Sequence, residues 1–126
     1  MQINSAKDLT VYTNAYELAM RIFELSKHFP AEERFALTSQ IRRSSRSVCL
    51  NLREAWSKRK CRAHFVSKLT DCDGENSETD SSLDFARDCC YMTAELPKEL
   101  SSLSREVGRM LGQMIRAPRA FLTSDF

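Results

Sequence analysis

The chain has 126 residues, 42% of them hydrophobic and 29% charged, and a formal net charge of +2 at neutral pH. This length and composition are typical of one globular domain, residues 1–126, and exclude a disordered chain. No stretch approaches 18 uncharged apolar residues, which excludes a membrane-spanning helix. Because the net charge is small, only the distribution of charge along the chain can indicate a class of partner.

The N-terminus and the cysteines indicate a compartment. The sequence MQINSAKDLTVYTN has no apolar run behind a basic start, so we expect no signal peptide. The five cysteines show no regular disulfide framework: Cys49, Cys61, Cys72, Cys89 and Cys90. We interpret them as reduced thiols, and we expect a cytoplasmic protein with no membrane partner.

Residues 8–29 and 37–57 have the spacing of amphipathic helices. In the first segment, apolar side chains recur in steps of four and three, at Val11, Ala15, Leu18, Ile22, Leu25 and Phe29. Pro30 ends this helix, because the residue before a proline is disfavoured in the α region. Thr38 is the predicted N-cap of the second helix. The same steps continue there at Leu37, Ile41, Ser44, Val48, Asn51 and Ala55.

Residues 62–90 and 94–117 repeat the pattern. The third segment has the most regular spacing, at Phe65, Leu69, Cys72, Asn76, Thr79, Leu83, Ala86 and Cys90. Thr93 is the predicted N-cap of the fourth helix, where Pro97 is tolerable in the first turn. Four amphipathic segments with short connections predict an all-α fold, an antiparallel up-down-up-down four-helix bundle.

Several polar residues occupy or flank positions where an apolar side chain would be expected. Asn51, Asn76 and Thr79 stand on the apolar seams of their helices. Buried polar groups need partners, and such pairing fixes the register of packed helices. We therefore predict a structural network of polar side chains between the second and third helices, with two carboxylates as acceptors for Arg43. Its members are Asn51, Glu54, Asn76, Glu78 and Thr79.

All three glycines fall inside predicted helices, where each costs about 1 kcal/mol relative to alanine. Narrow side chains allow another backbone to approach closely. The small residues therefore predict either tight packing inside one bundle or contact between copies in a homo-oligomer. The stripe comprises Gly74, Ser101, Ser104, Gly108 and Gly112.

Charge is divided sharply along the chain. Residues 42–68 hold nine arginines and lysines against Glu54 alone, and residues 71–88 hold seven acids against Arg87. A row of cations on a rigid helix suits nucleic-acid phosphates. The alternatives are that these cations are solvated, or that they pair with acids of the third helix. The candidate phosphate-binding residues are Arg42, Arg43, Arg46, Arg53, Lys58, Arg59, Lys60 and Arg62.

Patterns for catalysis, metal binding or cofactor binding are weak. The acidic run has Gly74 at its fourth position and Ser82 at its twelfth, which does not fit an EF-hand. Cys61-x-x-His64 lacks a second ligand pair at comparable spacing for zinc. Neither histidine has a recognisable nucleophile beside it. We therefore predict a protein that is not an enzyme and that has no cofactor or metal. A small-molecule or metal site in the core remains a third alternative.

Several motifs are similar to a known family. The chain has Asp8-Leu9 with Val11-Tyr12, then Phe29-Pro30, then LTSQIRR from Leu37 to Arg43. Further on come NLREA, from Asn51 to Ala55, then Gly74 with Glu78, and ARDCCYM. Over residues 8 to 117 these resemble the bacterial intervening-sequence proteins of large-subunit ribosomal RNA. Cys49 and Ala55 stand where that family has proline and glycine, and the third helix is more acidic than is usual there.

The resemblance implies a four-helix bundle associated with RNA or the ribosome. One branch of the family is the accessory protein of diversity-generating retroelements. It forms ring-shaped homopentamers whose basic surface binds nucleic acid and the reverse transcriptase. We therefore expect a non-catalytic homo-oligomer, a pentamer by this resemblance, that binds RNA or DNA or scaffolds a nucleoprotein complex. The alternative is a pure assembly module in which the basic second helix pairs with the acidic third.

Overall fold

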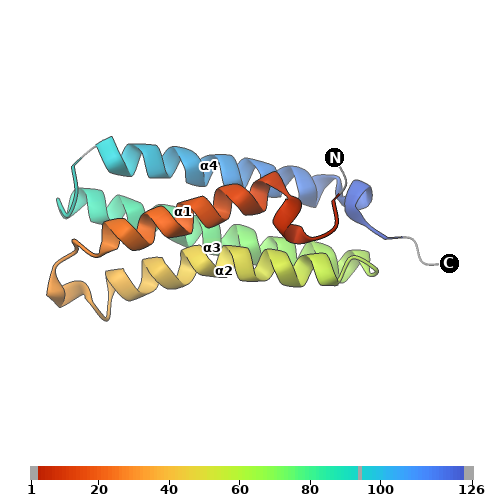
Figure 1. The fold of residues 1–126 in the computed structure, drawn as a ribbon, viewed down its shortest axis with the longest axis horizontal. Helices are drawn as coiled ribbons and strands as arrows, with labels where there is room; N and C mark the ends of the chain where they lie inside the picture. The colour runs from red at the N-terminus through yellow and green to blue at the C-terminus, as the bar shows by residue number, and fades with distance from the viewer. Residues whose placement is uncertain (1–2, 94, 124–126) are drawn as a thin grey trace.

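The computed structural model describes residues 3–93 and 95–123. Four long helices lie side by side and run in alternating directions (Figure 1), as the sequence predicts. They are α1 (Thr10–Ser26), α2 (Leu37–Ser57), α3 (Arg62–Asp88) and α4 (Glu95–Arg116). Three short 3-10 helices complete the described chain: η1 (Ala6–Asp8), η2 (Ala31–Glu33) and η3 (Pro118–Phe121). The described residues contain no β-strand.

Each helix packs on two neighbours. α1 contacts α2 and α4, and α3 contacts the same two helices, so that α2 and α4 lie diagonally opposite each other. The predicted all-α bundle is therefore confirmed. The diagonal arrangement gives α2 one side that faces α1, one side that faces α3, and an outer surface between them.

Several helix ends differ from the predicted ones because local contacts set them. The first helix begins at Thr10 rather than at residue 8, since Ser5 and Asp8 form a capping box on η1. The second helix spans the predicted residues 37–57, but its N-cap is Ala36 rather than Thr38, and the Glu33 carboxylate accepts from the Leu37 amide at 3.2 Å. The third helix stops at Asp88, two residues early.

Cys90 explains the early end of α3. Its φ of 63° is left-handed, and the Tyr91 amide donates to the Ala86 carbonyl at 3.0 Å. This is a common way for a helix to stop. The expected start of the fourth helix at residue 94 lies outside the described residues.

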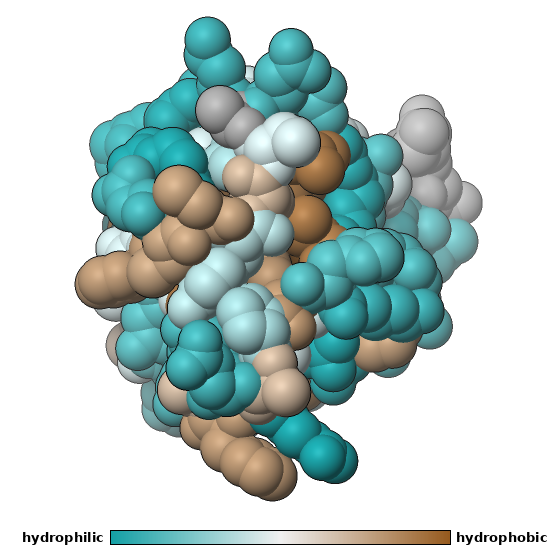
Figure 2. All heavy atoms as spheres, turned by 90° about the vertical axis from the view of Figure 1, so that its left-hand side faces the viewer, coloured by the Kyte–Doolittle hydropathy of each residue, from teal (hydrophilic) through white to brown (hydrophobic). Residues whose placement is uncertain are grey.

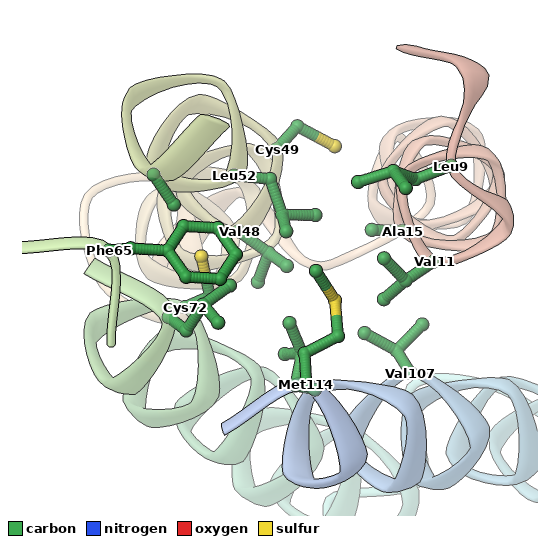
Figure 3. Close-up of a cluster of buried hydrophobic side chains, with 13 residues drawn as sticks. Leu9, Val11, Ala15, Val48, Cys49, Leu52, Phe65, Cys72, Val107 and Met114 are labelled. Atoms are coloured by element: carbon green, nitrogen blue, oxygen red, sulfur yellow. The ribbon is translucent and has the colours of Figure 1, made fainter. Parts of the chain in front are cut away.

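The core consists of two apolar clusters on either side of a polar layer. One cluster includes Leu52, Phe65 and Val107 (Figure 3), and the other includes Ile22, Ile41 and Leu83. Each of the four helices contributes apolar side chains of its predicted seam to one or both clusters. Burial in the first cluster raises the pKa of the Cys49 thiol to about 11 and of the Cys72 thiol to about 12, so both stay protonated.

The polar layer contains two side-chain pairs. The hydroxyl oxygens of Ser44 and Thr79 lie 2.8 Å apart between α2 and α3. Between α3 and α4, Asn76 Nδ2 donates to the Ser104 carbonyl at 2.9 Å, and the Ser104 hydroxyl donates to Asn76 Oδ1 at 3.3 Å. All four side chains are buried. Because a register shift would leave these groups unpaired, the layer fixes how the helices align.

The small-residue stripe divides between the interior and the surface. Ser101 and Ser104 are buried against the rest of the bundle. A Cβ on Gly108 would lie 3.2 Å from Asn76 Nδ2, so this glycine permits close packing of α3 and α4. Gly74 has nothing within 4 Å of an added Cβ, and Gly112 faces only Arg116 of its own helix.

Candidate nucleic-acid interface

The eight predicted phosphate-binding residues do not form one surface. Their side chains leave α2 and the α2–α3 connection in different directions. Arg43 faces α3, Arg42 and Arg46 lean toward α1, and Arg53 points outward. The remaining four lie at or beyond the end of α2: Lys58, Arg59, Lys60 and Arg62.

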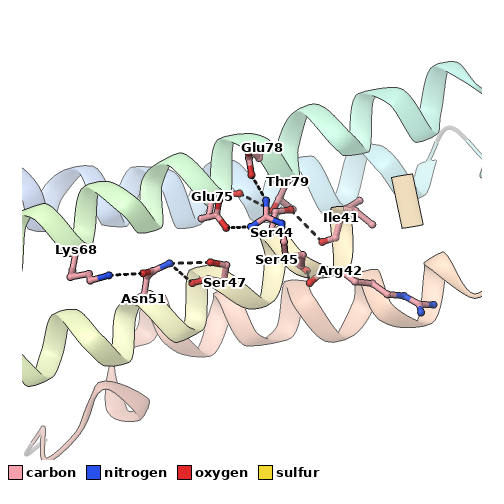
Figure 4. Close-up of polar contacts among 11 residues, drawn as sticks. Ile41, Arg42, Ser44, Ser45, Ser47, Asn51, Lys68, Glu75, Glu78 and Thr79 are labelled. Carbon is pink, nitrogen blue, oxygen red and sulfur yellow. Dashed lines mark hydrogen bonds and ion pairs between the residues drawn. The ribbon is translucent and has the colours of Figure 1, made fainter. Parts of the chain in front are cut away.

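Arg43 is neutralised by two carboxylates at the surface between α2 and α3. Its Nη1 lies 2.7 Å from Glu75 Oε2 and its Nη2 lies 2.7 Å from Glu78 Oε2 (Figure 4). These two hydrogen bonds raise the pKa of the guanidinium. Burial opposes ionisation of Glu75, but hydrogen bonds from Ser47 and Arg43 outweigh it and lower the pKa of this carboxyl. Arg43 therefore joins α2 to α3 and contributes little free positive potential.

Arg42 and Arg46 lie on the side of the helix that faces α1, over one aromatic ring of that helix. Their guanidinium carbons are 4.9 Å and 5.6 Å from the centroid of the Phe23 ring. Arg42 Nε also donates to the buried Ser26 hydroxyl at 2.7 Å, and its side chain extends away from Glu75 and Glu78 (Figure 4). Within the described part of the chain, neither guanidinium has a carboxylate at ion-pair distance. Their charges are thus held in place without being neutralised.

A surface groove extends from these two arginines to the start of α2. Its volume is about 540 Å³. Phe35 and Leu50 stand in its wall with 87% and 64% of their surface exposed. The Arg34 guanidinium lies 5.2 Å from the centroid of the Phe35 ring. We call this feature the arginine groove, and it is lined by Arg34, Phe35, Thr38, Ser39, Arg42, Arg43, Arg46 and Leu50.

Sequence reasoning missed two residues of the groove. Arg34 and Phe35 belong to the connection PAEERFA, which the helical period does not explain. A large aromatic side chain in an otherwise polar connection between two helices was the available signal. In the structure this segment lines the same groove as Arg42 and Arg46, which follow Phe35 by seven and eleven residues.

The other end of α2 carries a second group of cations. Arg59 covers the Trp56 ring at 3.7 Å, and its Nε donates to the Trp56 carbonyl at 2.8 Å. Lys58, Lys60 and Arg62 are exposed around the α2–α3 connection. A 21-residue helix is about 30 Å long, so this group lies at the opposite end of the bundle from Phe35.

The predicted polar network consists of three separate contacts. Besides the two pairs in the core, Asn51 Nδ2 donates to Ser47, and Lys68 donates to Asn51 Oδ1 at 3.4 Å (Figure 4). Glu54 is not an acceptor for Arg43, because Lys68 lies 2.7 Å from it and lowers its pKa. Glu78 does accept from Arg43, and Glu75 is a partner that the sequence did not indicate.

The described residues offer no arrangement for metal binding. Among residues 3–93 and 95–123, no three His, Cys, Asp or Glu side chains come together in a way that would hold an ion. Cys61 and His64 are both exposed at the start of α3. No helix in this part of the chain combines the length and the apolar character needed to cross a membrane.

Comparison with known proteins gives a family match and a structural match. Residues 7–113 match the family model of the 23S rRNA-intervening sequence protein. A crystal structure of a protein of unknown function from the S23 ribosomal protein family of Bacteroides thetaiotaomicron is 32% identical in sequence, with a TM-score of 0.78. The match covers 88% of this chain and 99% of that one. None of the curated proteins matches. The chain thus belongs to the 23S rRNA-intervening sequence protein family, as its motifs indicated.

Proposed function

We propose that this protein is a non-catalytic, homo-oligomeric binding protein that contacts nucleic acid through the outer and α1-facing surface of α2. The observation that carries the proposal is the state of the arginines on this helix. Arg42, Arg46 and Arg53 have no ion-pair partner among the described residues, whereas Arg43 has two. The family name, which refers to ribosomal RNA, is in agreement with a nucleic-acid role.

The spacing of these arginines suits a run of phosphates. Along the axis of α2, Arg42, Arg46 and Arg53 are separated by about 6 Å and about 10 Å. Each phosphate that they neutralise releases counterions and adds about 0.7 to 0.9 to the slope of log K against log salt. We therefore expect micromolar affinity that falls steeply with salt and depends little on base sequence.

Charge reversal on α2 tests the proposal. Arg46→Glu with Arg53→Glu should abolish retention of labelled RNA in a filter-binding assay at low salt. The matched control is Arg105→Glu with Arg116→Glu, which makes the same charge change at exposed positions of α4, diagonally opposite α2. The control should retain most of the affinity. No retention by the unmodified protein at low salt, or equal losses in both double variants, would contradict the proposal.

A second candidate is an assembly module without nucleic acid. The observation that favours it is Phe85, 64% exposed on α3 next to Asp84 and near Asp88. An exposed aromatic side chain among acids complements the arginine groove of another copy. In this case, Arg46→Glu with Arg53→Glu dissociates the oligomer in light scattering and leaves nucleic-acid affinity unchanged. Loss of affinity with an intact oligomer contradicts this candidate.

A further inference from the structure

We propose that the arginine groove binds unpaired nucleotides, with a base stacked on the ring of Phe35 and the phosphates on the arginines. This inference rests on the proposed function and adds to it the class of nucleic acid. Phe35 is the most exposed large hydrophobic side chain in the described part of the chain. Figure 2 views the end of the bundle that carries the α1–α2 connection, where apolar side chains project among hydrophilic ones.

The ring stands on a rigid support. Five hydrogen bonds hold the connection between η2 and α2. The backbone amides of Glu33, Arg34 and Ala36 donate to carbonyls three residues earlier, at 2.9 to 3.1 Å. The Glu33 carboxylate accepts from the Leu37 amide, and it also accepts from the Tyr91 hydroxyl at 2.6 Å. The backbone that carries Phe35 is therefore held in place by the fold.

The arginines beside the Phe35 ring are positioned to bind phosphates. The Arg34 guanidinium occupies one side of the Phe35 ring, at 5.2 Å, and leaves the rest of the ring open. Arg42 and Arg46 line the same groove and lie about 6 Å apart along the axis of α2. The Phe23 ring contacts both guanidiniums and holds them in position. The groove thus combines an aromatic platform with a short row of ordered positive charges.

This combination discriminates between single and double strands. Phosphate contacts alone do not select single strands, because a duplex carries the same phosphate groups at a higher density. A base in a duplex is stacked and paired, so it has no free face for a protein ring. An unpaired base stacks on an exposed aromatic side chain, and this contact tolerates any base. Phe35 therefore favours loops, bulges and single strands over a continuous duplex.

The test compares two forms of one labelled oligonucleotide, single-stranded and annealed to its complement, by fluorescence polarisation at low salt. Phe35→Ala should weaken binding of the single strand about tenfold and change duplex affinity less than about twofold, because only the stacked base is lost. Since the side chain is exposed, this variant should fold normally. Phe85→Ala, which removes another exposed phenylalanine on α3, should change neither affinity.

A fluorescent variant reports the stacking directly. Phe35→Trp should keep the single-strand affinity, and its emission should be quenched when the single strand binds, beyond any change of Trp56 in the unmodified protein. An acidic peptide containing leucine and phenylalanine is the competing ligand. If Phe35→Ala weakens peptide binding and leaves oligonucleotide binding intact, the groove is a protein-docking site and the inference is overturned.

The two proposals fail in different ways. If the unmodified protein binds neither form at low salt, the proposed function itself is wrong. If it binds both forms and Phe35→Ala has no effect on the single strand, the nucleic-acid function stands and the inference about unpaired bases is overturned.

Discussion

The arginines on the two sides of α2 have different kinds of partner. On the side that faces α3, Arg43 contacts two carboxylates at 2.7 Å, and Ser44 pairs with Thr79 in the core. On the side that faces α1, Arg42 and Arg46 rest on the Phe23 ring and form no ion pair with an acid of the described chain. On the α3 side the arginine charge joins two helices through ion pairs. On the α1 side the arginine charges are not paired with a carboxylate of the described chain.

The difference shows why a count of basic residues is a poor guide to a binding surface. Consecutive positions on a helix differ by about 100°, so Arg42 and Arg43 face different neighbours. An acidic partner helix removes the positive potential of one arginine, whereas an aromatic ring orders the other and leaves its charge exposed. The neighbouring helix decides which arginines can bind a polyanion.

The largest expected effect comes from removing the aromatic support on the α1 side. Phe23→Ala should lower the free energy of unfolding by about 2 kcal/mol, because it loses a half-buried ring and the cation–π contacts of three cations. Urea unfolding measures the loss. Phe35→Ala is the control, since that ring is 87% exposed and its truncation should cost less than about 0.5 kcal/mol. Equal losses would show that Phe23 is not a support.

A smaller effect is expected from the polar pair on the α3 side. Thr79→Val keeps the shape of the side chain but removes its hydroxyl from Ser44 and from the Glu75 carbonyl, and it should cost about 1 to 2 kcal/mol. Combined with Ser44→Ala, the loss should be less than the sum of the single losses by about 0.5 to 1 kcal/mol. Strictly additive losses in urea unfolding would mean that the two hydroxyls act independently.

Most of the fold follows from the spacing of apolar residues. The steps of four and three predicted four helices in a bundle, because each helix can bury only one face and the connections are short. The ends were less predictable. They depend on single contacts such as the Glu33 carboxylate at the start of α2 and the left-handed Cys90 at the end of α3. The period of a helix carries no information about such contacts.

Less of the site was predictable, because it depends on which helices are neighbours. The sequence identified the basic segment, but it left open whether each arginine meets an acid or water. Glu54 was expected near Arg43, yet it lies 2.7 Å from Lys68, since the geometry of packing selects the nearest partner. Phe35 could not be identified from the helical period, because it lies in the connection before α2, where that period does not apply.

The smallest expected effect concerns the ion pairs of Arg43. Arg43→Gln should cost less than about 1 kcal/mol at neutral pH, because all three charged groups are at least partly exposed and solvent screens them. The pH dependence of this loss of stability is more informative than its magnitude. In the folded protein the pKa of Glu75 lies below its usual value of 4.5. Its stabilising contribution is therefore present above that value and is lost as the pH falls through the folded pKa.

Without Arg43, Glu75 keeps the burial that opposes its ionisation but loses one of the hydrogen bonds that favour it. The folded pKa then rises, so the variant should lose less stability than the unmodified protein between about pH 5 and pH 3. Urea unfolding at a series of pH values measures both curves, which should converge at acid pH. Arg53→Gln removes an arginine of the same helix that has no ion pair among the described residues, and its curve should stay parallel to that of the unmodified protein. If the Arg43→Gln curve is also parallel, the charge of Arg43 is not neutralised by α3, and both sides of α2 would then carry available arginines.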